Sequence, residues 1–446
     1  MTDSQTDITT AAAAIVADIA GRLRDPTAVA ARMAAADSAR TQRDGASRPA
    51  WYGPSLATGY PGLALLFAEL RHTDDAYDRA ALACLAPIAE TMAAGPAPPP
   101  GLHVGPIAFA FATSSLVDVH DDFRPALQSI DRRVAARIPV RLRPELARIR
   151  SATPGTTFDA YDVVAGATGI GRYLLRRGVE PLPALTAILS YLTALAQPPT
   201  GGDPRLPGWW VGHGRYLAML TDDEGDEGHA NLGLAHGICG PLALLSLAWR
   251  AGVRVPGQDE AIARIVDWLL VWREPDVAGR YWPAVLSLAN LQRRPASLPR
   301  ARSAWCYGAP GVARAIQLAG LALGRADWTA VAEESTRSLL ANLDADHGVI
   351  DAGLCHGWAG LLHLTRLIGI DAGDRSIVEG ASQVVARIVD NYDPQAPFAF
   401  RAARPGAEPV DTPGYLDGAA GIALALHSYL SGTKPVTGWD AALLVA

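Results

Sequence analysis

The segment Gly237-Ile-Cys-Gly240-Pro-Leu-Ala-Leu-Leu-Ser-Leu-Ala248 contains two glycines three residues apart, followed by a run of apolar residues. The run is apolar on nearly every side, which is typical of a helix buried on all faces rather than of a surface helix. Because glycine has no Cβ atom, the two glycines would let neighbouring backbones approach closely at the start of that helix. The segment therefore predicts a buried helix that begins at a tightly packed turn.

The same pattern recurs along the chain, and recurrence at spacings of tens of residues indicates a repeat architecture. Amphipathic stretches such as 260–273 and 328–343 lie between the copies, and β-branched alternation is scarce. These features predict an all-α fold, an α/α toroid (double barrel) of seven helical hairpins whose inner helices start at the GxxG motifs. One copy alone would indicate only close helix packing. The first residues of the seven copies are Gly59, Leu102 (a degenerate copy, Leu102-His-Val-Gly105), Gly166, Gly237, Gly308, Gly357 and Gly418.

The composition limits the class of protein. Of the 446 residues 49% are hydrophobic and 19% are charged, so the chain can bury a large core and is not disordered. Lys and Arg number 39 against 45 Asp and Glu, and the net charge of −6 argues against a nucleic-acid-binding protein. We expect a single domain over residues 1–446, with an N-terminal helical segment at 1–50 and the sevenfold toroid at 51–430.

The cysteines and the apolar segments indicate the compartment. Four isolated cysteines in so long a chain do not form a disulfide framework, so we expect reduced thiols. The sequence contains no signal peptide and no run of about 20 apolar residues that could cross a membrane. We therefore expect a cytoplasmic protein that does not span the membrane.

Two stretches are predicted to be loops outside the toroid. Residues 96–106 contain five prolines, and residues 221–228 contain five acidic side chains. The acidic stretch is interpreted as a solvated surface loop. The alternative is that it guides a basic segment of a partner.

In a toroid, the residues just before the first glycine of each copy would gather at one end of the inner helices. Cys306 and Cys355 hold equivalent positions in adjacent copies, and His356 follows the second of them. Two thiols and one imidazole form a good Zn²⁺ site, and three protein ligands leave the fourth position open, as catalytic zinc sites do. The alternative is that both cysteines are ordinary buried side chains.

Four further polar residues are predicted at the same end. His236 holds the place that matches His356 in an earlier copy, and Tyr307 follows Cys306. Asp162 and Arg302 lie four and six residues before their own glycines. Each has a structural alternative. His236 could be a capping or core histidine and Tyr307 a packing residue. Asp162 could be the N-cap of its helix, and Arg302 could pair with an acid.

Taken together and in order, four segments resemble the signature segments of the lanthionine synthetase C-like (LanC-like) family. The resemblance covers about residues 50–430 and implies an α/α toroid with one Zn²⁺ per chain, bound by Cys306, Cys355 and His356. It also implies a stand-alone lanthipeptide cyclase. The four segments are Tyr161-Asp-Val163, Asn231-Leu-Gly-Leu-Ala-His-Gly-Ile-Cys-Gly-Pro241, Arg302-Ser-Ala-Trp-Cys-Tyr-Gly308 and Cys355-His-Gly-Trp-Ala-Gly360.

The reaction that this resemblance implies is the addition of substrate cysteine thiolates to dehydroalanine or dehydrobutyrine, which forms (methyl)lanthionine thioether rings. A free thiol is mostly protonated at neutral pH, and coordination to zinc deprotonates it. His236 is the candidate general acid that protonates the resulting enolate. Asp162 would orient His236 or receive the thiol proton, Arg302 would stabilise the enolate oxygen, and Tyr307 would position the substrate or a proton.

The resemblance also implies partners and leaves rival functions open. The expected substrate is a dehydrated precursor peptide with leader and core, and a lanthipeptide dehydratase and a transporter are further candidate partners, with the enzyme peripheral at the membrane in such a complex. The rivals are an enzyme that adds glutathione to dehydroamino acids in proteins, and a non-catalytic binding scaffold that contains zinc. A toroidal glycosidase is disfavoured because the sequence offers no clear pair of facing carboxylates.

Overall fold

The computed structural model describes residues 3–44, 49–94, 101–178, 182–199, 203–213, 228–276, 279–345 and 347–446. This part of the chain is mainly helical, which confirms the predicted all-α class. The acids at 222–227 and the prolines at 96–100 lie outside the described residues. None of the described helices combines the length and the apolar character needed to cross a membrane.

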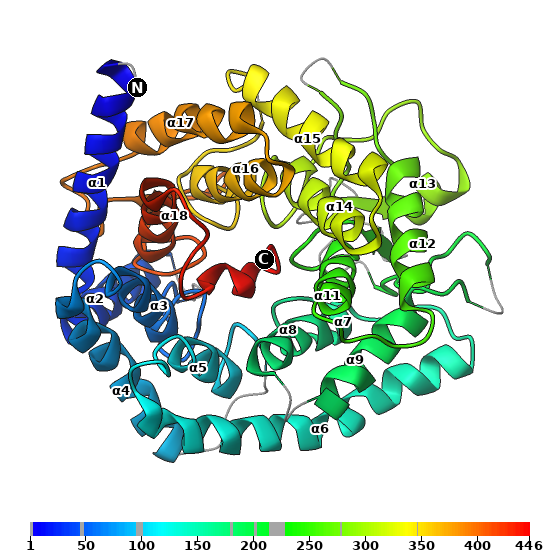
Figure 1. Ribbon diagram of the computed structural model, residues 1–446, viewed down its shortest axis with the longest axis horizontal. Helices are drawn as coiled ribbons and strands as arrows, with labels where there is room; N and C mark the ends of the chain where they lie inside the picture. The colour runs from blue at the N-terminus through cyan, green and yellow to red at the C-terminus, as the bar shows by residue number, and fades with distance from the viewer. Residues whose placement is uncertain are drawn as a thin grey trace. The chain divides into compact units, whose positions relative to one another are not determined.

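A buried helix follows each of the seven glycine turns, as predicted. Every residue of the second of these helices is buried, and so are ten of the eleven residues of the first. Five of the seven begin at the residue directly after the first glycine of their GxxG motif. Figure 1 labels all seven helices. These inner helices are α3 (Tyr60–Leu70), α5 (Pro106–Thr113), α8 (Ala167–Arg177), α11 (Cys239–Arg250), α14 (Ala309–Leu323), α16 (Trp358–Ala372) and α18 (Ala419–Ser431).

Several helices of a second set pack on the inner ones. The pairs α3–α4, α8–α9, α11–α12 and α14–α15 are hairpins of consecutive helices. The last inner helix, α18, packs instead against α1 from the N-terminal segment. The helices of this set, with α2 after α1, are α1 (Asp3–Leu23), α2 (Pro26–Asp44), α4 (Asp78–Ala94), α6 (Arg124–Arg150), α9 (Leu182–Leu195), α12 (Gln258–Val271), α15 (Ala326–Ala341) and α17 (Arg375–Asp390).

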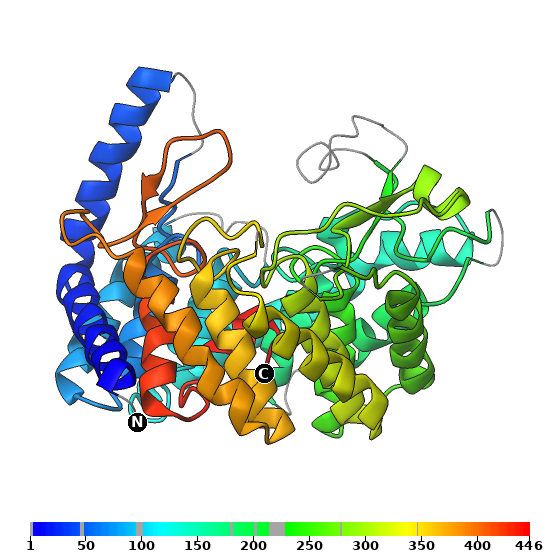
Figure 2. The same cartoon turned by 90° about the horizontal axis from the view of Figure 1, so that it is seen from above.

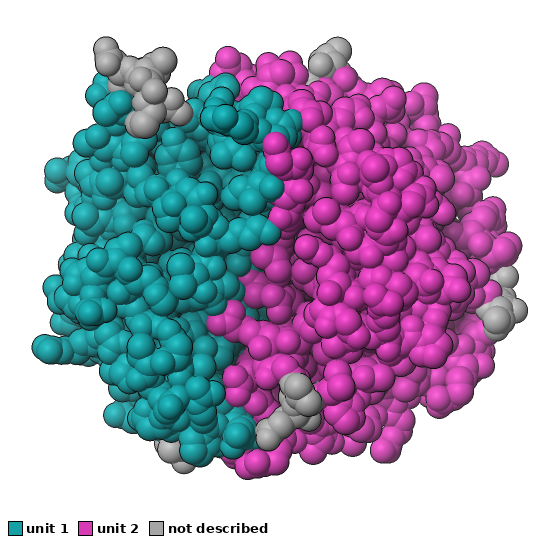
Figure 3. Space-filling model, viewed as in Figure 1, with its two compact units in different colours: residues 1–128, 349–370, 374–440 teal, residues 129–348, 371–373, 441–446 magenta. Residues whose placement is uncertain are grey.

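The chain divides into two compact units, which Figure 3 colours separately. Unit 1 consists of residues 1–128, 349–370 and 374–440, and it contains α3, α5 and α18. Unit 2 consists of residues 129–348, 371–373 and 441–446, and it contains α8, α11 and α14. Each unit therefore has its own set of buried inner helices.

Two small antiparallel pairs of strands lie in the connecting segments. In unit 2, β1 (His229–Asn231) pairs with β2 (Val285–Ser287), with Ala230 opposite Leu286. In unit 1, β3 (Arg401–Ala402) pairs with β4 (Val410–Asp411). The remaining short elements are α7 (Phe158–Tyr161), α13 (Leu288–Gln292) and the 3₁₀ turns η1 (Asp75–Tyr77), η2 (Asp121–Phe123) and η3 (Trp439–Leu443).

The first glycine of the motif serves the turn that precedes the inner helix. A Cβ atom on Gly308, whose φ is +85°, would overlap the carbonyl oxygen of Arg302, and one on Gly357 would overlap the backbone nitrogen of Gly353. Both neighbours belong to the same copy as the glycine. The expectation that these first glycines admit a neighbouring backbone is therefore wrong: they admit the chain's own turn, which folds back onto the start of its helix.

Hydrogen bonds between successive turns hold equivalent positions in line. In unit 2, the N–H of Ala235 donates to the carbonyl of Cys306 at 3.3 Å. In unit 1, the N–H of Cys355 donates to Leu416 at 2.8 Å, and the N–H of Leu416 donates to Ala57 at 3.0 Å. All five residues stand two positions before the first glycine of their copy. Residues at the same position of each turn therefore lie at the same end of the inner helices of their unit.

Candidate functional site

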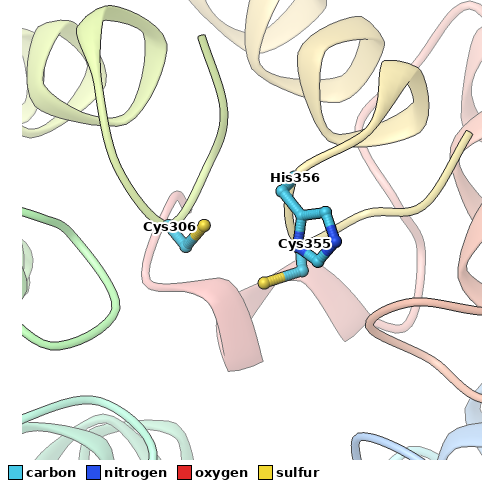
Figure 4. A group of neighbouring side chains, drawn as sticks. All are labelled: Cys306, Cys355 and His356. Atoms are coloured by element: carbon cyan, nitrogen blue, oxygen red, sulfur yellow. The ribbon is translucent and has the colours of Figure 1, made fainter. Parts of the chain in front are cut away.

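Cys306, Cys355 and His356 are brought together. Cys306 lies in the turn before α14, and the other two residues lie in the turn before α16. Their two thiol sulfurs and one imidazole nitrogen all lie within 4.8 Å of one another, and Figure 4 shows the three side chains around a common space. A tetrahedral zinc site holds its sulfur and nitrogen donors about 3.5–3.8 Å apart, so small side-chain rotations would bring this group to bonding geometry.

The other two cysteines lie in the core. Cys84 and Cys239 are fully buried, whereas Cys306 and Cys355 are half-buried. Burial raises the pKa of the thiols of Cys84 and Cys239 far above the ordinary value. A neutral, inaccessible thiol cannot bind an incoming metal ion. Only two of the four cysteines are therefore suitable ligands.

Asp162 and His236 form a hydrogen-bonded pair. The carboxylate is 1% exposed, and its Oδ1 accepts from the backbone N–H groups of Ala165 and Gly166 at 2.8 and 2.6 Å. Its Oδ2 lies 2.7 Å from His236 Nδ1, which must donate because a carboxylate only accepts. Asp162 thus closes the turn before α8 and also orients the histidine. The capping and the functional interpretation of Asp162 are compatible.

The environment of His236 favours its charged form. Burial lowers the pKa of His236, but the hydrogen bond and the charge of Asp162 and the nearby Cys306 raise it more, so the net pKa is higher than usual. The imidazole side chain is 35% exposed, and its Nδ1 is engaged by Asp162. The ring of Phe158 packs edge-on against it, with centroids 5.4 Å apart. His236 can therefore hold a proton at Nε2 in a fixed orientation.

Tyr307 is held by a residue that sequence reasoning did not single out. The side-chain amide of Asn231 donates to the hydroxyl oxygen of Tyr307 at 3.1 Å. Asn231 ends strand β1 and is 2% exposed. Because the amide occupies an acceptor site of the phenol oxygen, the phenol proton can be donated elsewhere. The ring of Tyr307 lies 6.5 Å from that of His236, centroid to centroid.

Arg302 occupies the same turn as Cys306, four residues earlier. Its side chain is half-buried, and within the described part of the chain its guanidinium has no hydrogen bond or ion pair. The expected alternative, a structural salt bridge, is not found among these residues. The charge of Arg302 is thus available for an anionic group of a ligand.

Two acids flank His356, and neither was predicted from the sequence as a site residue. Asp351 Oδ2 lies 3.6 Å from Nε2 of the ring, and Asp417 Oδ1 lies 3.7 Å from Nδ1. The repeat offers a signal for the first of them. Asp351 stands six residues before its glycine, which is also the position of Arg302 and Asn231 in their copies.

Comparisons with known proteins identify a family, a related sequence and a similar fold. Residues 50–444 match the family described as lanthionine synthetase C-like protein. The chain is 25% identical over 323 residues to the nisin biosynthesis protein NisC of Lactococcus lactis subsp. lactis, over 70% of this chain and 73% of that protein. The solved structure of a nisin cyclase is similar, with a TM-score of 0.70 and 22% identity over 94% of this chain and 97% of that one.

The structural similarity confirms the α/α toroid as the fold class. The predicted enzyme class, a lanthionine synthetase, is the one that the family's description names. The family match spans the turns that carry all seven predicted site residues. The chain therefore belongs to the lanthionine synthetase C-like family.

Proposed function

We propose that this protein is a zinc-dependent lanthipeptide cyclase, which adds cysteine thiols of a dehydrated precursor peptide to dehydroalanine or dehydrobutyrine. The observation that carries the proposal is the group of two thiols and one imidazole within 4.8 Å, in a chain that also contains the Asp162–His236 pair. The family match supports the same assignment. The product of each addition is a (methyl)lanthionine thioether.

The donor set fits zinc. Cys306, Cys355 and His356 would hold the ion, and two thiolates with one imidazole are ligands that Zn²⁺ prefers over harder cations. Three protein ligands leave room for one exogenous ligand. A zinc ion here would supply a Lewis acid that lowers the pKa of an incoming thiol, so that the thiolate is the nucleophile at neutral pH.

The Asp162–His236 pair would manage the proton. When the thiolate adds to the β-carbon, the alkene's π electrons form an enolate, and the new thioether is complete only when the α-carbon receives a proton. His236 holds that proton because Asp162 stabilises the imidazolium. The fixed orientation of the ring reduces the entropic cost of the transfer.

Arg302 and Tyr307 would assist the same step. A guanidinium placed near the enolate oxygen stabilises the negative charge that develops there. The phenol of Tyr307, whose oxygen accepts from Asn231, would direct its proton toward the substrate. Both side chains come from the turn that also carries Cys306.

The proposal extends to partners and boundaries. The substrate would be a precursor peptide with leader and core, modified beforehand by a lanthipeptide dehydratase and exported by a transporter, in a cytoplasmic complex that touches the membrane. We also propose that residues 1–446 act as one LanC-like domain, with the N-terminal helical segment at 1–50 and the toroid at 51–430.

The purified protein is expected to contain about one zinc ion per chain and to convert a dehydrated, cysteine-containing peptide to thioethers. Metal analysis and mass spectrometry with thiol labelling measure the two results. A metal-free preparation with full activity would contradict the zinc dependence. A parallel assay with glutathione as the thiol separates a peptide cyclase from an enzyme that modifies dehydroamino acids with glutathione, and a protein that binds zinc but turns over neither substrate would be a scaffold.

In the Asp162→Asn variant, the loss of activity on the alkaline side of the pH–rate profile is expected to occur at a lower pH than in wild type. His236 acts in its protonated form, so activity is lost as the pH rises through its pKa. Asp162 raises that pKa, and asparagine removes the charge while its amide oxygen can still accept from Ala165 and Gly166. The measurement is the pH–rate profile of zinc-loaded wild type and variant. An unchanged profile would remove the pair from the proton transfer.

A further inference from the structure

Asp351 is a buried carboxylate beside a candidate metal ligand. It is 1% exposed, and its Oδ1 accepts from the N–H of Gly353 at 3.0 Å, in its own turn. Its Oδ2 accepts from the N–H of Ala403 at 3.0 Å, in the loop between β3 and β4. Figure 2 shows this loop and the start of α16 on the same side of unit 1. The carboxylate is thus fixed from two directions by backbone donors.

His356 also lies beside this carboxylate. Oδ2 of Asp351 lies 3.6 Å from the ring's Nε2, slightly beyond hydrogen-bond distance, so a small rotation of the ring would close the contact. We propose that Asp351 is a positioning residue for His356. Its carboxylate accepts a hydrogen bond from the N–H at Nε2 of the ring, so that Nδ1 is presented to the metal ion. This inference rests on the proposed zinc site.

Equivalent turns of other copies show what the turn itself requires. Asn231 stands at the same position, and its amide oxygen accepts from the N–H of Gly233 at 2.9 Å. Thr412 stands there too, and its hydroxyl oxygen accepts from Gly414 at 3.4 Å. An uncharged acceptor therefore suffices to close the turn. The second oxygen of Asp351 accepts from Ala403, but its negative charge exceeds what either backbone contact requires and needs another explanation.

The free energy of a buried charge supplies that explanation. A carboxylate removed from water is costly unless hydrogen bonds and a partner compensate it. A neutral histidine that binds a metal through Nδ1 carries its proton on Nε2, and such protons are usually donated to a carboxylate or carbonyl that orients the ring. In Figure 4, one ring nitrogen of His356 lies toward the sulfur atoms and the other on the far side of the ring.

The second acid near the ring is less suited to this role. Asp417 is 22% exposed, and its other oxygen lies 3.8 Å from the guanidinium of Arg404. Its Oδ1 lies on the Nδ1 side of His356, the side that the proposal gives to the metal. The well-fixed acid, Asp351, therefore orients the ring, and the more exposed one borders the metal position.

The test is the zinc affinity of the purified full-length protein, measured by competition with a chromogenic chelator. Asp351→Asn should weaken zinc binding by about 10- to 100-fold, the usual effect of losing such an outer carboxylate. The asparagine oxygen can still accept from Gly353, as Asn231 does in its turn. Its NH₂ group faces Nε2 of His356 and the N–H of Ala403 and can accept from neither. Visible absorption of the Co²⁺-substituted protein should change as well, since the imidazole loses its fixed orientation.

Two variants guard against a simple loss of folding. Asp351→Thr introduces the residue type that the seventh copy has at this position, Thr412, and should weaken zinc binding to the same extent. Asp374→Asn is the matched control: Asp374 also accepts two backbone N–H groups, at the start of α17, but has no role near the ligands. It should leave zinc affinity and the Co²⁺ spectrum as in wild type. Thermal unfolding of each metal-free variant shows that the fold is retained.

The outcomes separate the two proposals. Wild-type protein that binds no zinc would overturn the zinc site itself, and with it this role of Asp351. Wild-type affinity in Asp351→Asn or Asp351→Thr would overturn only the role of Asp351. A larger loss in Asp417→Asn than in Asp351→Asn would also overturn it, because the ring would then be oriented from the Nδ1 side.

Discussion

Replacing Cys306 with alanine is expected to reduce the zinc content from about one ion per chain to near zero, because one of three protein ligands is lost. Cyclisation should fall to the uncatalysed rate, since the thiol of the substrate would then keep its ordinary pKa and stay mostly protonated at neutral pH. The measurements are metal analysis after extensive dialysis and the rate of thiol disappearance in a dehydrated peptide.

The control for this variant is Cys239→Ala. Cys239 is fully buried at the start of α11, and its raised pKa keeps the thiol neutral. Its loss leaves a small void that costs about 1 kcal/mol of unfolding free energy. It should leave zinc content and turnover intact. Zinc retained in Cys306→Ala, or lost in Cys239→Ala, would show that the proposed ligand set is wrong.

The inner helices could be predicted from the sequence because their turns repeat a steric requirement. α14 begins at Ala309, directly after Gly308, and α16 begins at Trp358, directly after Gly357. The glycines, and not the helix propensity of the residues that follow, mark these starting points. Their role could not be predicted, since the overlap of a Cβ atom with Arg302 or Gly353 depends on the path of the turn.

The candidate ligands could be recognised for a related reason. Cys306 and Cys355 hold the same register in their turns, and hydrogen bonds between successive turns, such as Ala235 to Cys306, keep that register in line. His236 was proposed as the general acid from its place directly before its glycine and from the family resemblance, and Asp162 as its partner from the same end of its copy and the same resemblance. Equivalence between copies thus supplies long-range information that local sequence patterns lack.

The supporting contacts could not be predicted in this way. The bond from Asn231 to Tyr307 joins residues that are 76 positions apart in the sequence, through side chains rather than backbone. The carboxylate of Asp351 meets Ala403 only because the β3–β4 loop returns to the turn before α16. Such contacts depend on loop paths that the repeat does not specify.

Replacing His236 with asparagine is expected to lower the rate of cyclisation by about 100- to 10,000-fold, the usual contribution of a general acid. Zinc content should stay the same, because His236 is not among the three grouped ligands. The asparagine amide can donate to Asp162 Oδ2 in place of Nδ1, so the buried carboxylate keeps a partner. The measurement is single-turnover cyclisation of a dehydrated peptide with zinc-loaded protein.

The matched control for His236→Asn is His120→Asn. His120 Nε2 lies 2.9 Å from Asp78 Oδ2, so the control removes a similarly half-buried, aspartate-paired histidine that the proposed mechanism does not use. Its turnover should equal that of wild type. A His236→Asn protein that retains both zinc and full turnover would mean that another group protonates the enolate. Loss of zinc together with turnover would mean instead that the histidine supports the metal rather than the proton transfer.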